Sequence, residues 1–200
     1  MTAVPFRIVR LQIQTRPMKV GKAPFREYRP EALQPVDRII ITPRGGEGEW
    51  QTDGVVQHAL DVHNQDHPQT RNPKGTAGVT VMATGDYVRL RRLYGDHVVD
   101  GIAGESILVD APDGLAEQAF PAEFTISTEA GMINFGRGRI AEPCVEFSRY
   151  CLREQPSSKA SADVRQALID LDTGHRGYRA AARDSGRIAI GDAVLLDLAG

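Results

Sequence analysis

The sequence predicts a mainly β fold, either a closed barrel or a sandwich, with a few peripheral helices. Three observations predict it. The chain has 200 residues, of which 41% are hydrophobic, and this is enough for one ordinary domain with a core. Its 20 glycines and 12 prolines are spread along the whole length, and the runs between them are short and rich in β-branched residues. No repeat or change of composition divides the chain, so we expect a single domain over residues 1–200.

The expected strands follow in order along the chain. Residues 6–14, FRIVRLQIQ, carry apolar side chains on both faces of an opening strand. A second strand, residues 36–42, stops at Pro43, and we expect the following RGGEGE to be a loop. The remaining expected strands are residues 79–82, 107–109 and 124–127, and a closing pair, 187–190 and 193–198, split by Gly-Asp.

Two segments have helical periodicity instead. Thr84 is of a residue type that caps helices, and the helix after it would carry apolar and aromatic side chains on one face and end at Gly95. Ser161 can cap a second helix, which we expect to end at Gly174. The polar stretch before that helix, residues 153–162, is typical of an exposed loop.

The charge balance excludes some classes of partner. Lys and Arg number 24 and Asp and Glu number 26, so the formal net charge is −2. This excludes bulk electrostatic binding to nucleic acid or to an anionic membrane, but it leaves room for a local basic site. No apolar run approaches the roughly 20 residues of a membrane helix, and the N-terminus has no signal-peptide pattern. We therefore expect a cytoplasmic protein.

The two cysteines lie in one segment, RGRIAEPCVEFSRYC, and are too few for a disulfide framework. Pro143 fixes the chain just before Cys144, and three arginines lie nearby in sequence. A guanidinium beside a thiol favours the thiolate, the form that attacks sulfur or binds a soft metal. A buried, inert thiol is the other interpretation, because free cysteine is among the most buried residue types. For Cys151, which follows two aromatic residues, packing is the stronger interpretation.

Histidines and aspartates gather in QHALDVHNQDHPQT, namely His58, Asp61, His63, Asp66 and His67. On a helix, His63 and His67 would point the same way and could bind zinc with His58 or Asp61 as a third ligand. The segment is polar and a proline follows directly, which disfavours a helix. The alternative is that these histidines are exposed to solvent or line a pocket through hydrogen bonds.

Two further segments combine glycine with polar or basic residues: GIAGES at 101–106 and HRGYRAAARDSGRIAIGD at 175–192. Glycine in a tight turn lets backbone N–H groups approach an anion, and arginine can bind a phosphate through two hydrogen bonds. Ordinary turns of a β protein explain the same glycines without a ligand.

In this order and at this separation, GIAGESILVDAP, EPC and RGYRAAARDSGRIAIGD resemble the MOSC family, the domains related to the C-terminal part of molybdenum cofactor sulfurase. The likeness covers most of the chain. The family turn Gly-x-x-Gly-Glu-Asn-Leu corresponds here to Gly101, Gly104, Glu105, Ser106 and Ile107. The family Pro-Cys corresponds to Pro143-Cys144, and the closing motif to Arg176, Gly177, Tyr178, Gly186, Gly191 and Asp192.

The chain departs from the family pattern at several positions. Ser106 and Ile107 replace the usual Asn and Leu. Many members carry an arginine three residues before the cysteine, where this chain has Ala141, with Arg139 two residues earlier. Many also carry a His-Gly-Gly segment in the first half, where this chain has DVHNQDHP. These changes bear on how the ligand is held more than on the fold.

The resemblance implies a closed β-barrel that binds the molybdenum cofactor, a pterin with a dithiolene, a phosphate and an oxo-metal. It implies that Cys144 is the functional thiol, as a molybdenum ligand or as a persulfide carrier. Arg139 and Arg176 would then hold the pterin phosphate, and His63 or His67 would pass protons. The other cofactor-binding residues that it implies are those of the two glycine turns: Gly104, Glu105, Ser106, Gly177 and Tyr178.

Three functions are compatible with these observations. The first is a small molybdenum-dependent reductase of N-hydroxylated compounds, with electrons from a separate donor protein, because the sequence has no GxGxxG-type loop and no iron–sulfur cysteine set. The second is a non-enzymatic carrier, which delivers a persulfide or the cofactor to a partner molybdoenzyme. The third is a barrel that has lost the cofactor and binds another anion.

Overall fold

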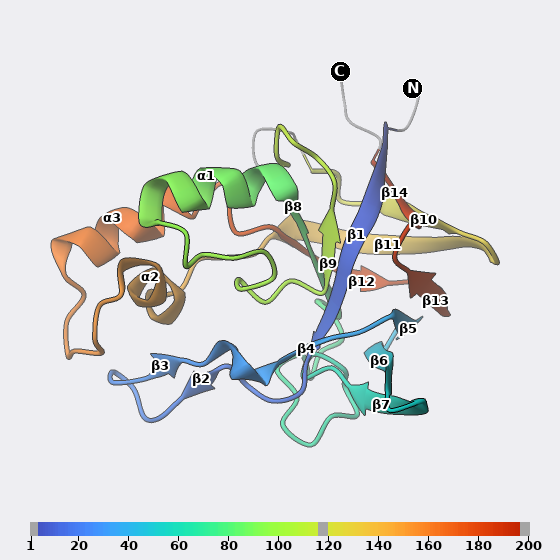
Figure 1. Ribbon diagram of the computed structural model, residues 1–200, viewed down its shortest axis with the longest axis horizontal. Coiled ribbons are helices and arrows are strands. Elements are labelled where there is room, and N and C mark those ends of the chain that lie inside the picture. The colour runs from blue at the N-terminus through green and yellow to red at the C-terminus, as the bar shows by residue number, and fades with distance from the viewer. Residues whose placement is uncertain (1–3, 116–119, 197–200) are drawn as a thin grey trace.

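The computed structural model describes residues 4–115 and 120–196 and has a closed β-barrel at its centre (Figure 1). Around the barrel the strand order is β14-β10-β11-β12-β8-β9-β1, and β14 pairs again with β1 to close it. Within the described residues these seven strands are β1 (Val4–Gln14), β8 (Val79–Ala83), β9 (Ile107–Val109), β10 (Phe124–Thr128), β11 (Gly131–Ile140), β12 (Tyr178–Ala182) and β14 (Ala193–Leu196). This confirms the prediction of a mainly β, closed-barrel fold with a few helices.

The barrel strands form because their side chains fill a common interior. Each neighbouring pair is antiparallel except β8 and β9, which run parallel. All residues of β8 and β9 are buried, as expected for strands covered on both faces. The expected closing strand ends at Leu196 in the structure, and residues 197 and 198 lie outside the described residues.

A second sheet packs against one side of the barrel and has the order β13-β5-β6-β7. Its strands are β13 (Gly186–Ala189), β5 (Arg38–Thr42), β6 (Gly45–Thr52) and β7 (Val55–Leu60). Its isoleucines Ile39, Ile41 and Ile188 belong to the same apolar cluster as the barrel interior. Another short strand, β4 (Leu33–Pro35), extends the barrel sheet beside β1.

The expectation that RGGEGE is a loop is wrong, because most of this segment forms β6. The glycines allow the strand to lie directly on the core. A Cβ at Gly48 would come within 2.9 Å of the Ile13 side chain, and one at Gly46 within 2.9 Å of Ile39. The intervening glutamates point the other way, and Glu49 pairs with Arg38 on the neighbouring strand (3.1 Å). The glycine content of this segment, which resembles that of a turn, therefore reflects a strand that packs closely on the core.

In the part of the chain that the structure describes, three α-helices lie together beside the barrel (Figure 1): α1 (Thr84–Tyr94), α2 (Val145–Leu152) and α3 (Ala162–Asp170). Ser161 caps α3 as predicted, and its hydroxyl accepts a hydrogen bond from the Val164 N–H (3.1 Å). Thr84 is instead the first residue of α1, and its hydroxyl accepts from the Ala111 N–H. Helix α1 ends at Gly95 as predicted, whereas α3 ends before Gly174. Helix α2 was not predicted.

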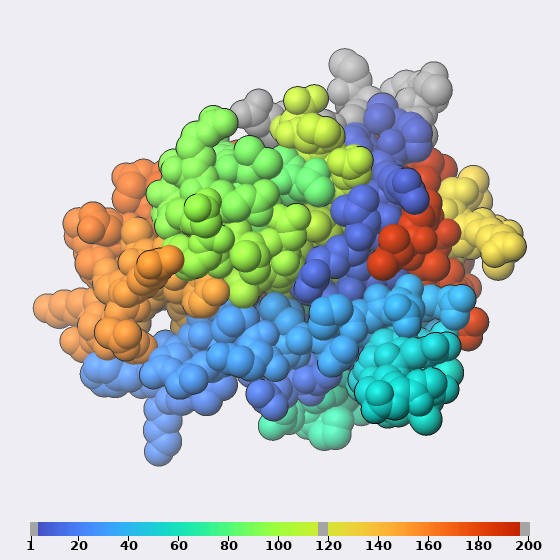
Figure 2. All heavy atoms as spheres, in the orientation of Figure 1, coloured from blue at the N-terminus to red at the C-terminus, as the bar shows by residue number. Residues whose placement is uncertain are grey.

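The helices bury a second apolar cluster, which includes Tyr87, Leu90, Phe147 and Cys151. A short hairpin, β2 (Lys19–Val20) and β3 (Glu27–Tyr28), and the 3-10 turn η1 (Pro30–Ala32) complete this side. Figure 2 shows these blue N-terminal segments along the lower edge of the molecule, beneath the green and orange helices. In the described part of the chain, every helix is too short or too polar to cross a membrane.

Candidate functional site

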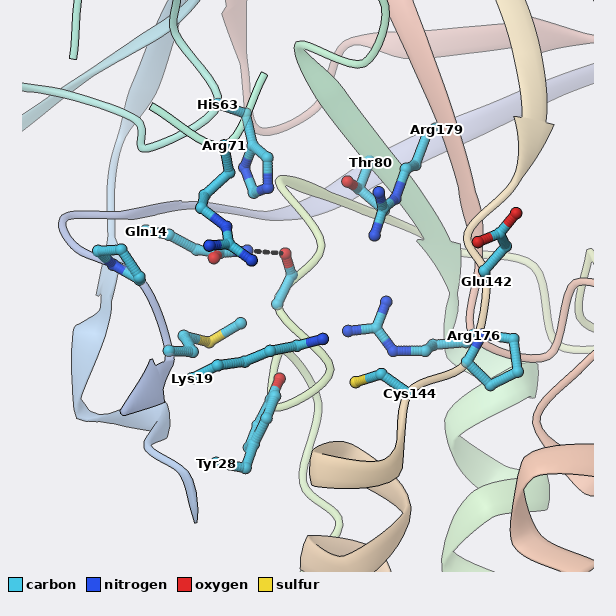
Figure 3. Close-up of a pocket in the computed structure, with 14 residues that line it drawn as sticks. Gln14, Lys19, Tyr28, His63, Arg71, Thr80, Glu142, Cys144, Arg176 and Arg179 are labelled. Carbon is cyan, nitrogen blue, oxygen red and sulfur yellow. Dashed lines mark hydrogen bonds between the residues drawn. The ribbon is translucent and has the colours of Figure 1, made fainter. Parts of the chain in front are cut away.

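A pocket of about 280 Å³ lies where the hairpin β2–β3, one end of the barrel and the start of α2 meet (Figure 3). Four of its side chains are cationic, namely Lys19, Arg71, Arg176 and Arg179, and one, Glu142, is a carboxylate. The remaining lining residues are Gln14, Pro17, Met18, Tyr28, His63, Thr80, Gly104, Pro143 and Cys144. The excess of positive charge makes this a site for an anionic group.

Cys144 is placed in the pocket by the turn into helix α2. It is the N-cap residue, with extended backbone angles (φ −137°, ψ 149°), and its carbonyl accepts the Ser148 N–H. Its thiol is half-buried and lies beside the guanidinium of Arg176 (Figure 3). The geometry therefore places this sulfur next to a buried cation, in reach of a ligand in the pocket.

Arg176 is a buried cation, with 7% of its surface exposed. One Nη donates to the Ala103 carbonyl (3.0 Å), and the guanidinium lies 5.2 Å from the centre of the Phe147 ring. Its Nε has no hydrogen-bond partner among the described residues. Burial acts to lower the pKa of Arg176, but Cys144 and other acidic groups nearby hold it above its usual value. Arg176 therefore stays charged and offers an unused donor.

Arg179 is a pocket residue that the sequence analysis did not identify. It lies on β12 and points toward the pocket (Figure 3). Burial, together with the nearby Arg176 and Arg139, lowers the pKa of Arg179. Its guanidinium makes no hydrogen bond or ion pair to the described residues. Glu142 is the one carboxylate of the lining that acts against this repulsion, so the arginines outnumber it and an anionic ligand would be favoured beside them.

Arg139, which was predicted to bind the cofactor, lies outside the pocket lining. It is the cross-strand partner of Arg179, but its guanidinium is exposed and donates to the Thr76 carbonyl (2.8 Å). Ala141, where the family pattern has arginine, is fully buried. Arg179, and not Arg139, therefore contributes a cation to the pocket lining, and contact between Arg139 and a ligand stays a prediction.

The other two cations come from segments distant in sequence. The Nζ of Lys19 lies 3.3 Å from Glu146 on α2, and Arg26 from the same hairpin lies 3.2 Å from that carboxylate. Burial opposes ionisation of Glu146, but its backbone hydrogen bond and these two cations hold its pKa below the usual value. Arg71 follows the histidine segment, and its guanidinium has no partner in the described part of the chain.

His63 lines the pocket, and a carboxylate fixes its ring. The Nδ1 of His63 lies 2.8 Å from Asp61 Oδ1. Asp61 is buried and also accepts the backbone N–H groups of Gln14 and His63, at 2.8 and 2.7 Å. A carboxylate acceptor holds the proton on Nδ1, so Nε2 is the atom available toward the pocket.

The other members of the histidine segment have separate partners. His67 accepts the Gln69 N–H at Nδ1 (3.0 Å) and faces the Thr15 carbonyl with Nε2 (3.2 Å), outside the pocket lining. His58 lies on β7 beside Glu47 (3.6 Å), and Asp66 pairs with Arg44. Over residues 4–115 and 120–196, no three His, Cys, Asp or Glu side chains are grouped so that they could hold a metal ion. His63 and Asp61 are thus in contact, but His58 and His67 have other partners and complete no zinc site with them.

The glycine turn contributes one residue to the lining, Gly104, which has φ +85°. This φ is strained for any residue with a Cβ, which favours glycine, and a Cβ there would also require the end of the Met18 side chain, 2.3 Å away, to shift. Glu105 and Ser106 are buried behind it. Glu105 accepts a hydrogen bond from the Tyr87 hydroxyl (2.7 Å), and burial raises its pKa to about 7. These two residues support the turn rather than facing the pocket.

In the closing motif, Arg176 lines the pocket, whereas Gly177 and Tyr178 lie behind it. Gly177 has φ +83°, and its carbonyl accepts the Ala141 N–H (2.9 Å), which joins the segment of Cys144 to that of Arg176. Tyr178 points to the barrel interior and donates to the Leu115 carbonyl (3.1 Å). Neither residue lines the pocket, so contact with a ligand stays a prediction for both.

Comparison with known proteins gives structural matches only. A crystal structure of a hypothetical protein matches with a TM-score of 0.57 and 14% identity, over 97% of this chain and 69% of the other. YuaD from Bacillus subtilis matches with a TM-score of 0.55 and 12% identity, over 97% and 96%. YiiM from Escherichia coli matches with a TM-score of 0.54 and 13% identity, over 96% and 69%.

No protein-family model matches the sequence, and no curated protein matches it. At identities of 12–14% the structural likeness shows the fold alone. That fold is a mainly β closed barrel with a few helices, as the sequence resemblance implies.

Proposed function

We propose that the pocket binds the molybdenum cofactor, with the Cys144 thiolate as a ligand of the metal. The observation that carries this proposal is the placement of Cys144, Arg176 and Arg179 in one cavity (Figure 3). The MOSC-like fold supports it. Thiolate is a soft ligand of the kind that binds soft metals, and guanidinium groups match phosphate oxygens.

The chemistry of the lining fits such a group. The pocket has four cations against one carboxylate, and the buried Nε of Arg176 has no partner among the described residues. Within a protein interior, unpaired buried donors are costly, so a ligand that accepts from them gains affinity. Arg176 and Arg179 would hold the phosphate, and Cys144 would bind the metal.

We propose further that the protein is a reductase of N-hydroxylated compounds. The bound cofactor would supply two-electron redox chemistry, and a separate protein would supply the electrons. His63 would hold a proton at Nε2 and give it to the leaving oxygen of the substrate, while Asp61 keeps the ring oriented through Nδ1. This assigns the proton transfer to His63 and not to His67, which lies outside the pocket lining.

A non-enzymatic carrier is the alternative within the same pocket. A carrier requires a thiol that a partner protein can reach and no group that moves protons. The half-buried position of Cys144 and the His63–Asp61 pair both favour the reductase. The two functions differ in what they require of His63.

The test is the molybdenum and pterin content of protein purified without air from a host that makes the cofactor. We expect both near one per chain in the wild type and in Cys151→Ala, and metal lost in Cys144→Ser. Equal contents in wild type and Cys144→Ser would contradict the role of Cys144, and no molybdenum or pterin in any variant would overturn the proposal. His63→Gln should keep the cofactor and lose reduction of an N-hydroxylated amidine, whereas a carrier would be unaffected.

A further inference from the structure

The turn at residues 101–105 forms part of the pocket wall, and side chains from elsewhere in the chain hold each of its five carbonyls. Gln12 donates to the carbonyls of residues 101 and 105, at 2.6 and 2.8 Å. Tyr28 donates to that of residue 102 (2.8 Å), and Gln14 to that of residue 104 (2.8 Å). Arg176 donates to the middle carbonyl, that of Ala103 (3.0 Å). The turn is therefore the part of the fold to which Arg176 is anchored.

A second set of bonds fixes Ala103 from behind the turn. The Tyr87 hydroxyl accepts the Ala103 N–H (3.0 Å) and donates to Glu105 Oε2 (2.7 Å). Tyr87 is fully buried, and Glu105 is 2% exposed. Three consecutive hydrogen bonds thus connect the Glu105 carboxyl, the Tyr87 hydroxyl, the backbone of Ala103 and the guanidinium of Arg176.

We infer that Tyr87 and Glu105 are positioning residues. They act through Ala103 to orient the guanidinium of Arg176 toward an anionic ligand in the pocket. This inference rests on the proposed function, because the orientation of the Arg176 guanidinium matters only if it holds an anionic group. Neither Tyr87 nor Glu105 is among the residues that line the pocket.

The composition of this network supports a role beyond packing. A carboxyl group buried among apolar side chains opposes folding, and the raised pKa of Glu105, about 7, reflects that cost. The three hydrogen bonds of the network are directional and lie in a core of low dielectric constant, where such bonds are stronger than in water, so they fix geometry more sharply than apolar contacts do. The Arg176 guanidinium also lies over the face of Phe147, but this contact does not fix its rotation about the ring normal. The bond to Ala103 therefore sets the direction of the guanidinium.

The test uses inorganic phosphate as the anion and Cys144 as the reporter, on folded protein without cofactor. The rate of Cys144 alkylation by iodoacetamide is measured by peptide mass spectrometry at increasing phosphate, which gives the concentration for half-maximal protection. In Tyr87→Phe we expect this concentration to rise at least about fivefold, because Ala103 and Arg176 lose their fixed orientation. Cys151 should stay unmodified in the same samples, which shows that the variant is folded.

The matched control is Tyr94→Phe, on the same helix, whose hydroxyl faces Asp170 and not the turn (3.5 Å). It should keep the wild-type concentration within about twofold. Glu105→Gln retains an oxygen that accepts from Tyr87 and should also stay within about twofold, whereas Glu105→Leu should behave like Tyr87→Phe. The melting temperature of each variant shows how far a loss of stability, rather than a change in anion binding, accounts for its effect on phosphate protection.

Three results would overturn the inference. If Tyr87→Phe lowers the melting temperature but leaves phosphate protection unchanged, Tyr87 is merely structural. If Glu105→Gln weakens protection as much as Glu105→Leu, the hydrogen-bond chain does not position Arg176. If phosphate does not protect the wild type, there is no anion for Arg176 to hold. Only this last result also counts against the proposed function, and the molybdenum content then decides that question separately.

Discussion

Helix α2 carries a cysteine at each end, and the two thiols have different surroundings. Cys144 is the N-cap residue and is half-buried in the cationic pocket. Cys151 lies in the last turn, 1% exposed, within the apolar cluster of the helical side. Burial raises the pKa of Cys151 to about 12. The comparison shows that position relative to the pocket, and not the residue type, makes one thiol available for chemistry.

The largest expected difference between the two thiols is in reactivity. In native protein near neutral pH, we expect iodoacetamide to modify Cys144 at least about 100-fold faster than Cys151, because Cys151 is buried and stays protonated. Peptide mass spectrometry of timed samples measures both rates in one experiment. Comparable rates in folded protein would show that the environments of the two thiols do not differ as described. Unfolding in denaturant should make the rates similar.

The effect of burial that separates Cys151 from Cys144 also predicts a pH dependence of stability at Glu105. Its pKa is about 7 in the folded protein, above the ordinary value of 4.5, so the folded state holds the proton more tightly than the unfolded state. The free energy of unfolding should therefore fall as pH rises from about 5 to 8, by about 2 kcal/mol from this group.

Glu105→Gln should remove that dependence, because glutamine does not titrate. Urea unfolding of wild type and variant at pH 5, 6, 7 and 8 measures the difference. The variant should gain stability relative to the wild type as pH rises. Parallel stability curves would show that Glu105 is not perturbed by burial and that polar groups behind the turn are accessible to solvent.

The smallest expected effect concerns the arginines near Cys144. Arg179 faces the pocket, whereas its cross-strand partner Arg139 is exposed and bonded to Thr76. Arg179→Gln should raise the phosphate concentration that half-protects Cys144 about fivefold, and Arg139→Gln should change it by less than about twofold. The reverse order would return the anion contact to Arg139. Cys151 should be unaffected in both variants.

The sequence predicts much of the fold because strands with two buried faces have a clear local pattern. Residues 79–82 and 107–109 are short β-branched runs, and both are barrel strands. The RGGEGE segment forms a strand that its local pattern does not predict. Its glycines resemble a turn locally, and the strand forms because they pack on Ile13 and Ile39, which no local pattern reveals. Helix α2 has eight residues, too few to show a helical period, and depends on packing through Phe147 and Cys151.

The site is predictable in part for a related reason. Cys144 and Arg176 stand in motifs that the resemblance to the MOSC family picks out. Alternation along β12 could have identified Arg179, because Tyr178 and Ala180 fill the core and Arg179 must face the other way. What lies on that other face depends on segments far apart in sequence. Lys19 and Arg71 reach the pocket from a hairpin and a loop, and nothing in their local sequence indicates this.

The central claim is that Cys144 is a ligand of molybdenum, and X-ray absorption at the molybdenum K-edge tests it most directly. Cofactor-loaded wild type and Cys151→Ala should each show one more sulfur neighbour of the metal than the dithiolene supplies. Metal that Cys144→Ser retains, when supplied with excess cofactor, should lack that neighbour. A wild-type spectrum with the dithiolene sulfurs alone, or the same sulfur count in wild type and Cys144→Ser, would contradict the claim.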